Sequence, residues 1–532
     1  MKRKLTMKQK ALPVDAPLYH TDHSRPVTRR DFLRQGFITG SASMLSGGVL
    51  GLFANPQQAM AALSSDVNSL ATDIGCSLGG LTGDAKVPFI CFDLAGGANF
   101  AGSNVLVGGA GGQNDGTIST AGYSKMGIPG DMVPGLDSTN FTLFNPSTNN
   151  DFVNDDLGLQ FHADSAMLRG ILETAGAAVG NVDGCVIPAR SDNDTGNNPH
   201  NPLYGIAKMG ARGSVVDLIG SRNSESGGNS MAPANMINPE FRPTKVDRPT
   251  DVTGMVDVGN LTAILNNPAD VTAVMESMAR ITHKKLKLGA VNTGLGVSQD
   301  EVVKDLVRCG YLKAADLADR FAGQVVNPVQ DTDIVSIFSG AGLDVTSDGE
   351  FQKTASVMKM VLNGYSAAGC ITMGGYDYHT GDRATGESRD LRAGRCIGAC
   401  LNYADILQKP LMIYVYSDGS VASNGMRDDS AGGRGKGQWT GDNSSTACSF
   451  FLVYNPTPPT LLLPGRQIGR FSADASVVTS SSPAANNVNL LVNTVLLNYM
   501  ALNNEVALFD STFGPHGLGT DLDPLIAFDP LT

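Results

Sequence analysis

Tryptophan, charged residues and long apolar runs are all scarce in this sequence. There is one tryptophan in 532 residues, and charged residues make up 17% of the chain, against about 25% in an average globular protein. So low a charged fraction excludes disorder driven by charge and a charged coiled coil. No run of about 18 apolar residues follows the N-terminal region, which excludes a polytopic membrane protein.

Glycine, in contrast, is abundant. It accounts for 63 of the 532 residues, well above the share of about 7% that is usual. Because glycine permits tight turns that other residues resist, we expect a compact globule with many loops. The length could hold two or three domains, but a single large α/β domain also reaches this size.

The N-terminus has the pattern of an export signal. Two adjacent arginines, Arg29 and Arg30, precede a moderately apolar stretch over residues 36–54. The sequence Ala-Met-Ala at residues 59–61 then supplies the small-x-small pattern that signal peptidase cleaves. This order predicts a twin-arginine (Tat) signal peptide over residues 1–61. The alternative is a chance basic start to an amphipathic helix.

The predicted signal changes the charge balance of what remains. It holds nine of the 39 basic residues but only three of the 51 acidic ones, so residues 62–532 are more acidic than the whole chain, whose formal net charge is −12. This acidity argues against nucleic acid and anionic membranes as partners. We expect a protein of the periplasm, the cell surface or the exterior, carried by the Tat translocase and without a membrane span after cleavage.

The eight cysteines all lie beyond the predicted signal. An exported location permits disulfide bonds, although Tat substrates fold in the reducing cytoplasm. Cys91, Cys370 and Cys448 lie in apolar, strand-like runs, which indicates buried thiols. No Cys-x-x-Cys pair and no Cys/His spacing typical of zinc occurs. The sequence therefore allows two states of the cysteines: buried free thiols, or one or more disulfide bonds.

Continuous apolar runs alternate with helical patterns along residues 62–532. The predicted strands cover residues 87–94, 184–188, 370–373, 411–416 and 449–453. The predicted helices include residues 165–178, 387–407 and 489–502. The alternation predicts one α/β domain with a mostly parallel central sheet and helices on both faces. We also expect long loops, and a partly helical insertion around residues 210–350.

Polar residues follow several of these predicted strands. In an open parallel sheet, ligands bind outside the carboxyl ends of the strands, so residues far apart in sequence could share one site. Carboxylates with an imidazole suit zinc, manganese, magnesium or calcium. The alternative for each aspartate is a helix cap or a turn. The candidates are Asp93 and Asn99, His200, Asp377 with His379, and Asp418. Asp377 with His379 is the strongest pair, because both follow a Gly-Gly turn directly after a strand.

Four features together resemble one known family. They are the twin-arginine start, the Gly-Gly-Ala-Asn turn ending at Asn99, the Gly-Tyr-Asp-Tyr-His segment at residues 375–379 before a long helix, and the strand that ends in Ser-Asp-Gly at residues 417–419. The chain resembles the exported bacterial family catalogued as domain of unknown function 1501. The core of that family is similar to the alkaline phosphatase and sulfatase superfamily, which implies an alkaline-phosphatase-like fold.

The resemblance also implies a set of metal ligands. Asp377, His379 and Asp442 match the family pattern, Asp418 replaces a glutamate, Asn99 replaces an aspartate and Asn443 replaces a histidine. Amide oxygens bind hard cations without adding charge, and they bind zinc poorly. These replacements favour a calcium- or magnesium-like site, or no metal, over a two-metal hydrolytic site.

The superfamily implies hydrolysis of phosphate or sulfate esters, with metal ions activating a hydroxyl or a water. Ser103 lies near the usual place of the nucleophile after the first strand and is the candidate here. Two alternatives stand beside a metal-dependent hydrolase of small-molecule esters. One is a non-catalytic exported protein of an envelope or surface assembly on the same scaffold. The other is a module that binds glycans or calcium.

Overall fold

The computed structural model of the chain describes residues 58–59, 63–76, 80–81, 86–113, 115–191, 198–256, 265, 267–287, 291, 293–294, 296–321 and 324–531. The chain divides into a unit of residues 1–50 and a unit of residues 51–532, and every described residue belongs to the second. The predicted signal peptide, apart from residues 58–59, lies outside the described residues, as does part of the loop before His200.

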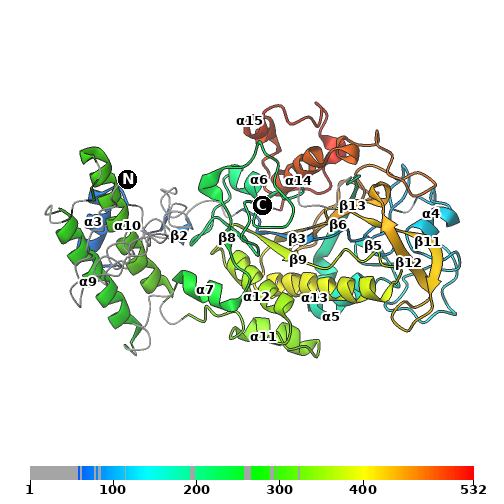
Figure 1. Cartoon of the computed structure of the whole chain (residues 1–532), viewed down its shortest axis with the longest axis horizontal. Coiled ribbons are helices and arrows are strands. Elements are labelled where there is room, and N and C mark those ends of the chain that lie inside the picture. Colours follow the sequence, from blue (N-terminus) through cyan, green and yellow to red (C-terminus); the bar gives the residue numbers. More distant parts are fainter. Residues whose placement is uncertain are drawn as a thin grey trace, which may run out of the picture. The chain divides into compact units, whose positions relative to one another are not determined.

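A central sheet of seven strands organises the second unit, in the order β6-β13-β10-β3-β9-β7-β8 (Figure 1). Only β13 runs antiparallel to its neighbours in this sheet. The strands are β6 (Val182–Pro188), β13 (Cys448–Tyr454), β10 (Leu411–Tyr416), β3 (Phe89–Leu94), β9 (Ala368–Met373), β7 (Leu218–Gly220) and β8 (Thr244–Lys245). The predicted α/β class with a mostly parallel sheet is confirmed.

Alternate residues of β3 enter two separate apolar cores. Ile90 and Phe92 belong to one core, and Phe89 and Cys91 belong to the other. The helices of the first core include α5 (Ala166–Ala175), α12 (Gly349–Leu362) and α13 (Ala384–Ile406). Those of the second core include α6 (Leu203–Lys208) and α14 (Val488–Leu502). Because successive side chains of a strand point to opposite faces, helices cover both faces of the sheet, as predicted.

Glycine lets two of these helices approach closely. A Cβ atom on Gly394 of α13 would lie 2.0 Å from the backbone oxygen of Met167 on α5, and one on Gly398 would lie 2.4 Å from that of Ile171. Any larger residue at these positions would force the two helices apart. Part of the high glycine content therefore serves packing rather than turns.

Residues 210–350 contain the helices that the sequence predicts, but also β7 and β8, which it does not. These strands have only three and two residues, too few for the period of a strand to be visible in the sequence. The helices are α7 (Pro249–Val256), α9 (Pro268–Lys287), α10 (Val297–Phe321) and α11 (Thr332–Gly340). None of the described helices has the length and apolar character needed to cross a membrane.

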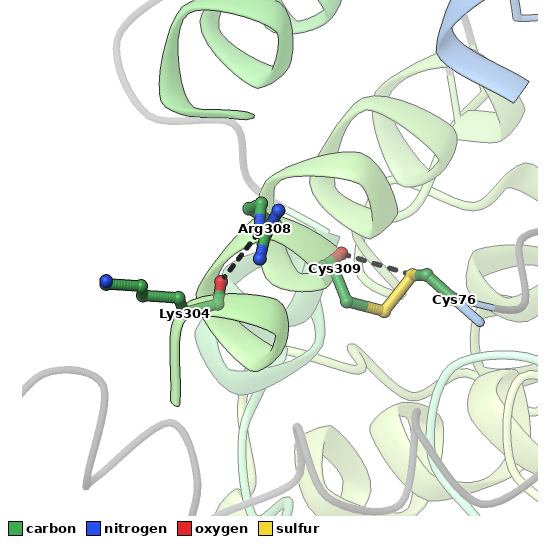
Figure 2. The surroundings of a disulfide bond; sticks show 4 residues. All are labelled: Cys76, Lys304, Arg308 and Cys309. Carbon is green, nitrogen blue, oxygen red and sulfur yellow. Dashed lines mark hydrogen bonds between the residues drawn. A yellow bond between two sulfur atoms is a disulfide. The ribbon is translucent and has the colours of Figure 1, made fainter. Parts of the chain in front are cut away.

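A disulfide bond joins two distant segments. Helix α3 (Ser65–Asp73) packs with α9 and α10 around a small apolar core that includes Val67 and Leu312. Cys76, just after α3, is bonded to Cys309 on α10 (Figure 2). The other six cysteines are free and buried. The protein therefore contains both a disulfide bond and buried free thiols, the two states that the sequence allowed.

Long loops, as predicted, make up much of the described chain between β3 and β6, together with a short helix and a hairpin. The helix is α4 (Thr120–Lys125), and the hairpin is the pair β4 (Val153–Leu157) and β5 (Leu159–His162). A second hairpin follows β10 and bears directly on the site. It consists of β11 (Val421–Asp428) and β12 (Lys436–Asp442).

Candidate metal centre

The carboxyl ends of the parallel strands meet at one edge of the sheet. Strands β6, β10, β3, β9 and β7 run in the same direction, so the segments that follow them gather there. Within this edge the structure separates an exposed group of acidic and imidazole side chains from a buried one.

The exposed group consists of Asp377, His379 and Asp442, which we call the Asp-His-Asp cluster. Each residue offers one ligand atom, and these atoms all lie within 4.8 Å of one another. The His379 Nε2 atom lies 2.6 Å from Asp377 Oδ1 and 3.7 Å from Asp442 Oδ1. The side chains are 63%, 36% and 52% exposed in the order Asp377, His379, Asp442, so solvent reaches all three. A divalent cation could bridge them with small adjustments of the side chains.

Two buried tyrosines hold the segment that carries Asp377 and His379. The Tyr376 hydroxyl donates to the backbone oxygen of Arg389 at 2.9 Å, and the Tyr378 hydroxyl accepts from the backbone N–H of Asn99 at 3.0 Å. Both rings are buried. Because the segment alternates inward and outward side chains in the manner of a strand, burying the two tyrosines turns Asp377 and His379 toward solvent.

Backbone packing fixes the same segment from the other side. Gly96 has a φ of 126°, and a Cβ atom there would lie 2.4 Å from the backbone nitrogen of Asp377. Only glycine tolerates both the dihedral angle and the contact. Asp442, the third member of the cluster, ends β12 opposite Val421 of β11. The β11–β12 hairpin thus brings it to residues that precede it by more than sixty positions.

Asp93 and Asp418 form the buried group and lie apart from the cluster. Asp93 Oδ2 accepts the backbone N–H groups of Asn229 and Ser230 at 2.6 and 2.9 Å. Asp418 accepts from the backbone N–H of Gly96 at 2.7 Å and from Asn229 Nδ2 at 2.9 Å. Both aspartates are at most 1% exposed. They anchor backbone segments that are distant in sequence, a role that differs from the helix cap or turn offered by the sequence as the alternative to a ligand.

Burial dominates the protonation of Asp93. Desolvation raises its pKa to about 6, although the hydrogen bonds from Ser230 and Asn229 and the charge of Arg222 act in the opposite direction. A carboxylate buried without a close cationic partner is costly. The ionised form of Asp93 therefore lowers the stability of the folded protein.

The two predicted amide ligands serve the fold instead. Asn99 is buried, and its Nδ2 donates to the backbone oxygen of Val421 at 2.8 Å. Asn443 Oδ1 accepts the backbone N–H of Ser445 at 2.9 Å and caps the short helix η3 (Ser444–Thr446).

His200 and Ser103 are also buried away from the Asp-His-Asp cluster. His200 Nε2 lies 3.1 Å from Ser191 Oγ, and its ring stacks on Tyr416 with 5.7 Å between ring centroids. Burial lowers the pKa of His200 to about 3, which keeps the ring neutral. The Ser103 hydroxyl donates to the backbone oxygen of Met126 at 2.6 Å, so its position does not support the predicted role as a nucleophile.

Sequence reasoning missed a polar pocket at the ends of β7, β8 and β9. Its volume is about 570 Å³, and its lining includes Arg222, Lys245, Lys353 and Asn229. Because β7 and β8 are too short to be recognised in the sequence, no strand was predicted to end near Arg222 or Lys245. The run of serine, asparagine and glycine over residues 221–230 was the available signal.

No family model matches the chain, and no curated protein matches it. The resemblance to the family catalogued as domain of unknown function 1501 therefore stays a prediction.

The raised pKa of Asp93 makes the stability of the protein depend on pH. The folded protein holds the Asp93 proton more tightly than the unfolded chain, so this contribution to stability is complete below about pH 4 and is lost as the pH rises through about 6. We expect the free energy of unfolding of the wild type to fall relative to Asp93→Asn by about 2 kcal/mol between pH 4 and pH 7. Denaturant titration of both proteins at each pH measures this, and parallel pH profiles would contradict it.

Proposed function

We propose that the chain is an exported protein that hydrolyses phosphate or sulfate esters with a divalent metal ion held by Asp377, His379 and Asp442. The observation that carries the proposal is the convergence of these three side chains from two distant segments, with their ligand atoms within 4.8 Å. One imidazole with two carboxylates suits zinc or manganese better than calcium or magnesium, because imidazole is a poor ligand for hard cations. We therefore propose zinc, with manganese as the competitor.

The arrangement of the cluster is consistent with hydrolysis. Three protein ligands are typical of catalytic zinc sites, which keep a position open. A divalent ion held there would polarise an ester oxygen and make a nearby water more acidic. Asp377 and Asp442 supply two negative charges beside the imidazole of His379. We propose water as the nucleophile, because the Ser103 hydroxyl is engaged with Met126.

A specific observation favours a second function. Asp93, Asp418, Asn99, Asn443 and His200 each hydrogen-bond within the protein, which leaves three ligands of a larger predicted set. A single ion held by three residues of an exposed surface could order that surface without catalysis. The second candidate is therefore a non-catalytic exported protein of an envelope or surface assembly, with a structural ion in the same cluster.

Metal binding is the first test. We expect the purified protein to bind about one equivalent of zinc, and Asp377→Asn or His379→Gln to weaken that binding more than about tenfold, because each removes a ligand. Asp429→Asn is the matched control, since Asp429 is 76% exposed and lies outside the cluster. Elemental analysis and competition with a chelating dye give the stoichiometry and the affinity. Undiminished zinc binding by the Asp377/His379 double variant would place the site elsewhere.

Ester turnover separates the two candidate functions. We expect the zinc- or manganese-loaded protein to release nitrophenol from 4-nitrophenyl phosphate or 4-nitrophenyl sulfate, and Asp442→Asn to reduce the rate at least about tenfold, because it removes a charge next to the ion. The Asp429→Asn control should keep the rate. Zinc binding with no turnover of either ester across a series of metals would favour the non-catalytic candidate.

Export can be followed through the signal and the disulfide together. We expect replacement of Arg29 and Arg30 by lysine to retain the precursor in the cytoplasm, where reducing conditions keep Cys76 and Cys309 as thiols. The exported wild type should carry the Cys76–Cys309 bond and six thiols that react only after unfolding. Fractionation followed by peptide mapping of alkylated protein checks both points. Normal export of the lysine variant would exclude the Tat route.

A further inference from the structure

The polar pocket at the ends of β7, β8 and β9 gathers positive charge in an acidic protein. Its volume is about 570 Å³. Three cationic side chains line it, Arg222, Lys245 and Lys353, against two carboxylates, Asp247 and Glu350. The chain as a whole has 51 acidic and 39 basic residues, so an excess of positive charge in a concave site runs against the average composition.

Hydrogen-bond and ion-pair partners position the two lysines of the pocket, and each lysine keeps N–H donors that are free to bind a ligand. Lys353 Nζ contacts Glu350 Oε2 and the backbone oxygen of Thr372, both at 2.7 Å. Lys245 Nζ lies 2.7 Å from Asp247 Oδ2. Because an ammonium group carries three N–H donors, each lysine can still donate to a ligand. The carboxylates hold the lysines in place and balance two of the three charges.

Arg222 supplies the remaining charge. Its side chain lines the pocket and is exposed, and within the described part of the chain it forms no ion pair of salt-bridge length. Its charge is one of the influences that oppose the raised pKa of Asp93, but Asp93 is buried and its Oδ2 accepts two backbone N–H groups. A guanidinium has five N–H donors in a planar fork and pairs well with phosphate and similar oxyanions.

The loop that carries Arg222 is held rigidly. Residues 221–230 wrap around the buried Asp93, which accepts two of their backbone N–H groups. Ser224 Oγ donates to the backbone oxygen of Gly228 at 2.7 Å, and Ser226 Oγ donates to that of Ser230 at 2.6 Å. A loop ordered before the ligand arrives loses little entropy on binding. Asp93 is thus a positioning residue for the pocket.

The pocket adjoins the Asp-His-Asp cluster through a short chain of contacts. Asn229, which lines the pocket, donates from Nδ2 to Asp418 at 2.9 Å, and Asp418 accepts from the backbone N–H of Gly96 at 2.7 Å. Gly96 in turn packs directly against Asp377. Gly374, at the start of the segment that leads to Asp377, also lines the pocket.

We propose that this pocket binds a tetrahedral oxyanion, phosphate or sulfate, with Arg222 as the principal ligand and Lys245 and Lys353 as further donors. The anion is held either as the free ion or as the charged group of an ester. This inference deepens the proposed function, and it rests on that function for the choice of phosphate and sulfate. The charge and geometry of the pocket do not depend on the metal.

Binding of the free anions by the full chain, treated with a chelator, tests the proposal. Calorimetric titration at low ionic strength with inorganic phosphate and with inorganic sulfate should give saturable binding of at least one of them. Arg222→Gln should weaken it about tenfold, because a charge-assisted bond is lost. Arg222→Lys, which keeps the charge but not the fork, should weaken it less. Arg470→Gln removes an exposed arginine outside the pocket and should bind as the wild type does.

Two further arms identify the source of the anion and separate the two proposals. Phenyl phosphate and phenyl sulfate, titrated in the same way, show whether an ester group binds as the free ion does. The Asp377→Asn variant should lose metal binding and keep its anion binding. A wild-type protein that binds anions but neither binds zinc nor turns over an ester would end the proposed function and leave the pocket intact. Wild-type protein without saturable binding of any of these anions, or Arg222→Gln and wild type with equal affinity, would overturn the inference.

Discussion

The parallel pairing of β3 with both β9 and β10 is the constraint on which the site depends. In this register Asp93, near the end of β3, lies beside Thr372 on one neighbour and Tyr416 on the other. Three strands that end at the same level release three segments at the same edge of the sheet. Every candidate functional group described above is carried by one of these segments or is held against one.

The same edge uses carboxylates for two different purposes, and burial decides which. Asp93 and Asp418 lie within the fold and accept backbone N–H groups from the segments that cross them. Asp377 and Asp442 stand at the surface with an imidazole between them. A buried carboxylate is stabilised only by donors that the protein itself supplies, whereas an exposed one can exchange water for a cation. A carboxylate therefore anchors the backbone where it is buried, and is a candidate metal ligand where it is exposed.

Asn229 connects the two buried aspartates to the polar pocket. Its backbone N–H binds Asp93, its side chain binds Asp418, and it lines the pocket with Arg222. Because Asn229 contacts both Asp93 and Asp418, these two aspartates fix the position of the loop that carries Asn229. We infer that the cation-rich pocket and the Asp-His-Asp cluster are parts of one surface, organised from beneath by two aspartates.

The sequence by itself determined the central strands and the strongest pair of candidate ligands. Continuous apolar runs predicted β3, β6, β9, β10 and β13, because a strand buried on both faces is apolar at most of its positions. Asp377 and His379 could be predicted because they follow a Gly-Gly turn directly after a strand, which is a local property of the chain.

Tertiary structure alone decided the rest. Asp442 joins the cluster only because β11 and β12 form a hairpin, and Asn443, its neighbour in sequence, turns to cap a helix instead. Strand β7 exists because the edge of β9 offers it hydrogen bonds, and β8 because the edge of β7 does so in turn, not because two or three residues carry a pattern. Whether a carboxylate binds backbone or solvent depends on which segment covers it, and that is settled by contacts between residues far apart in the chain.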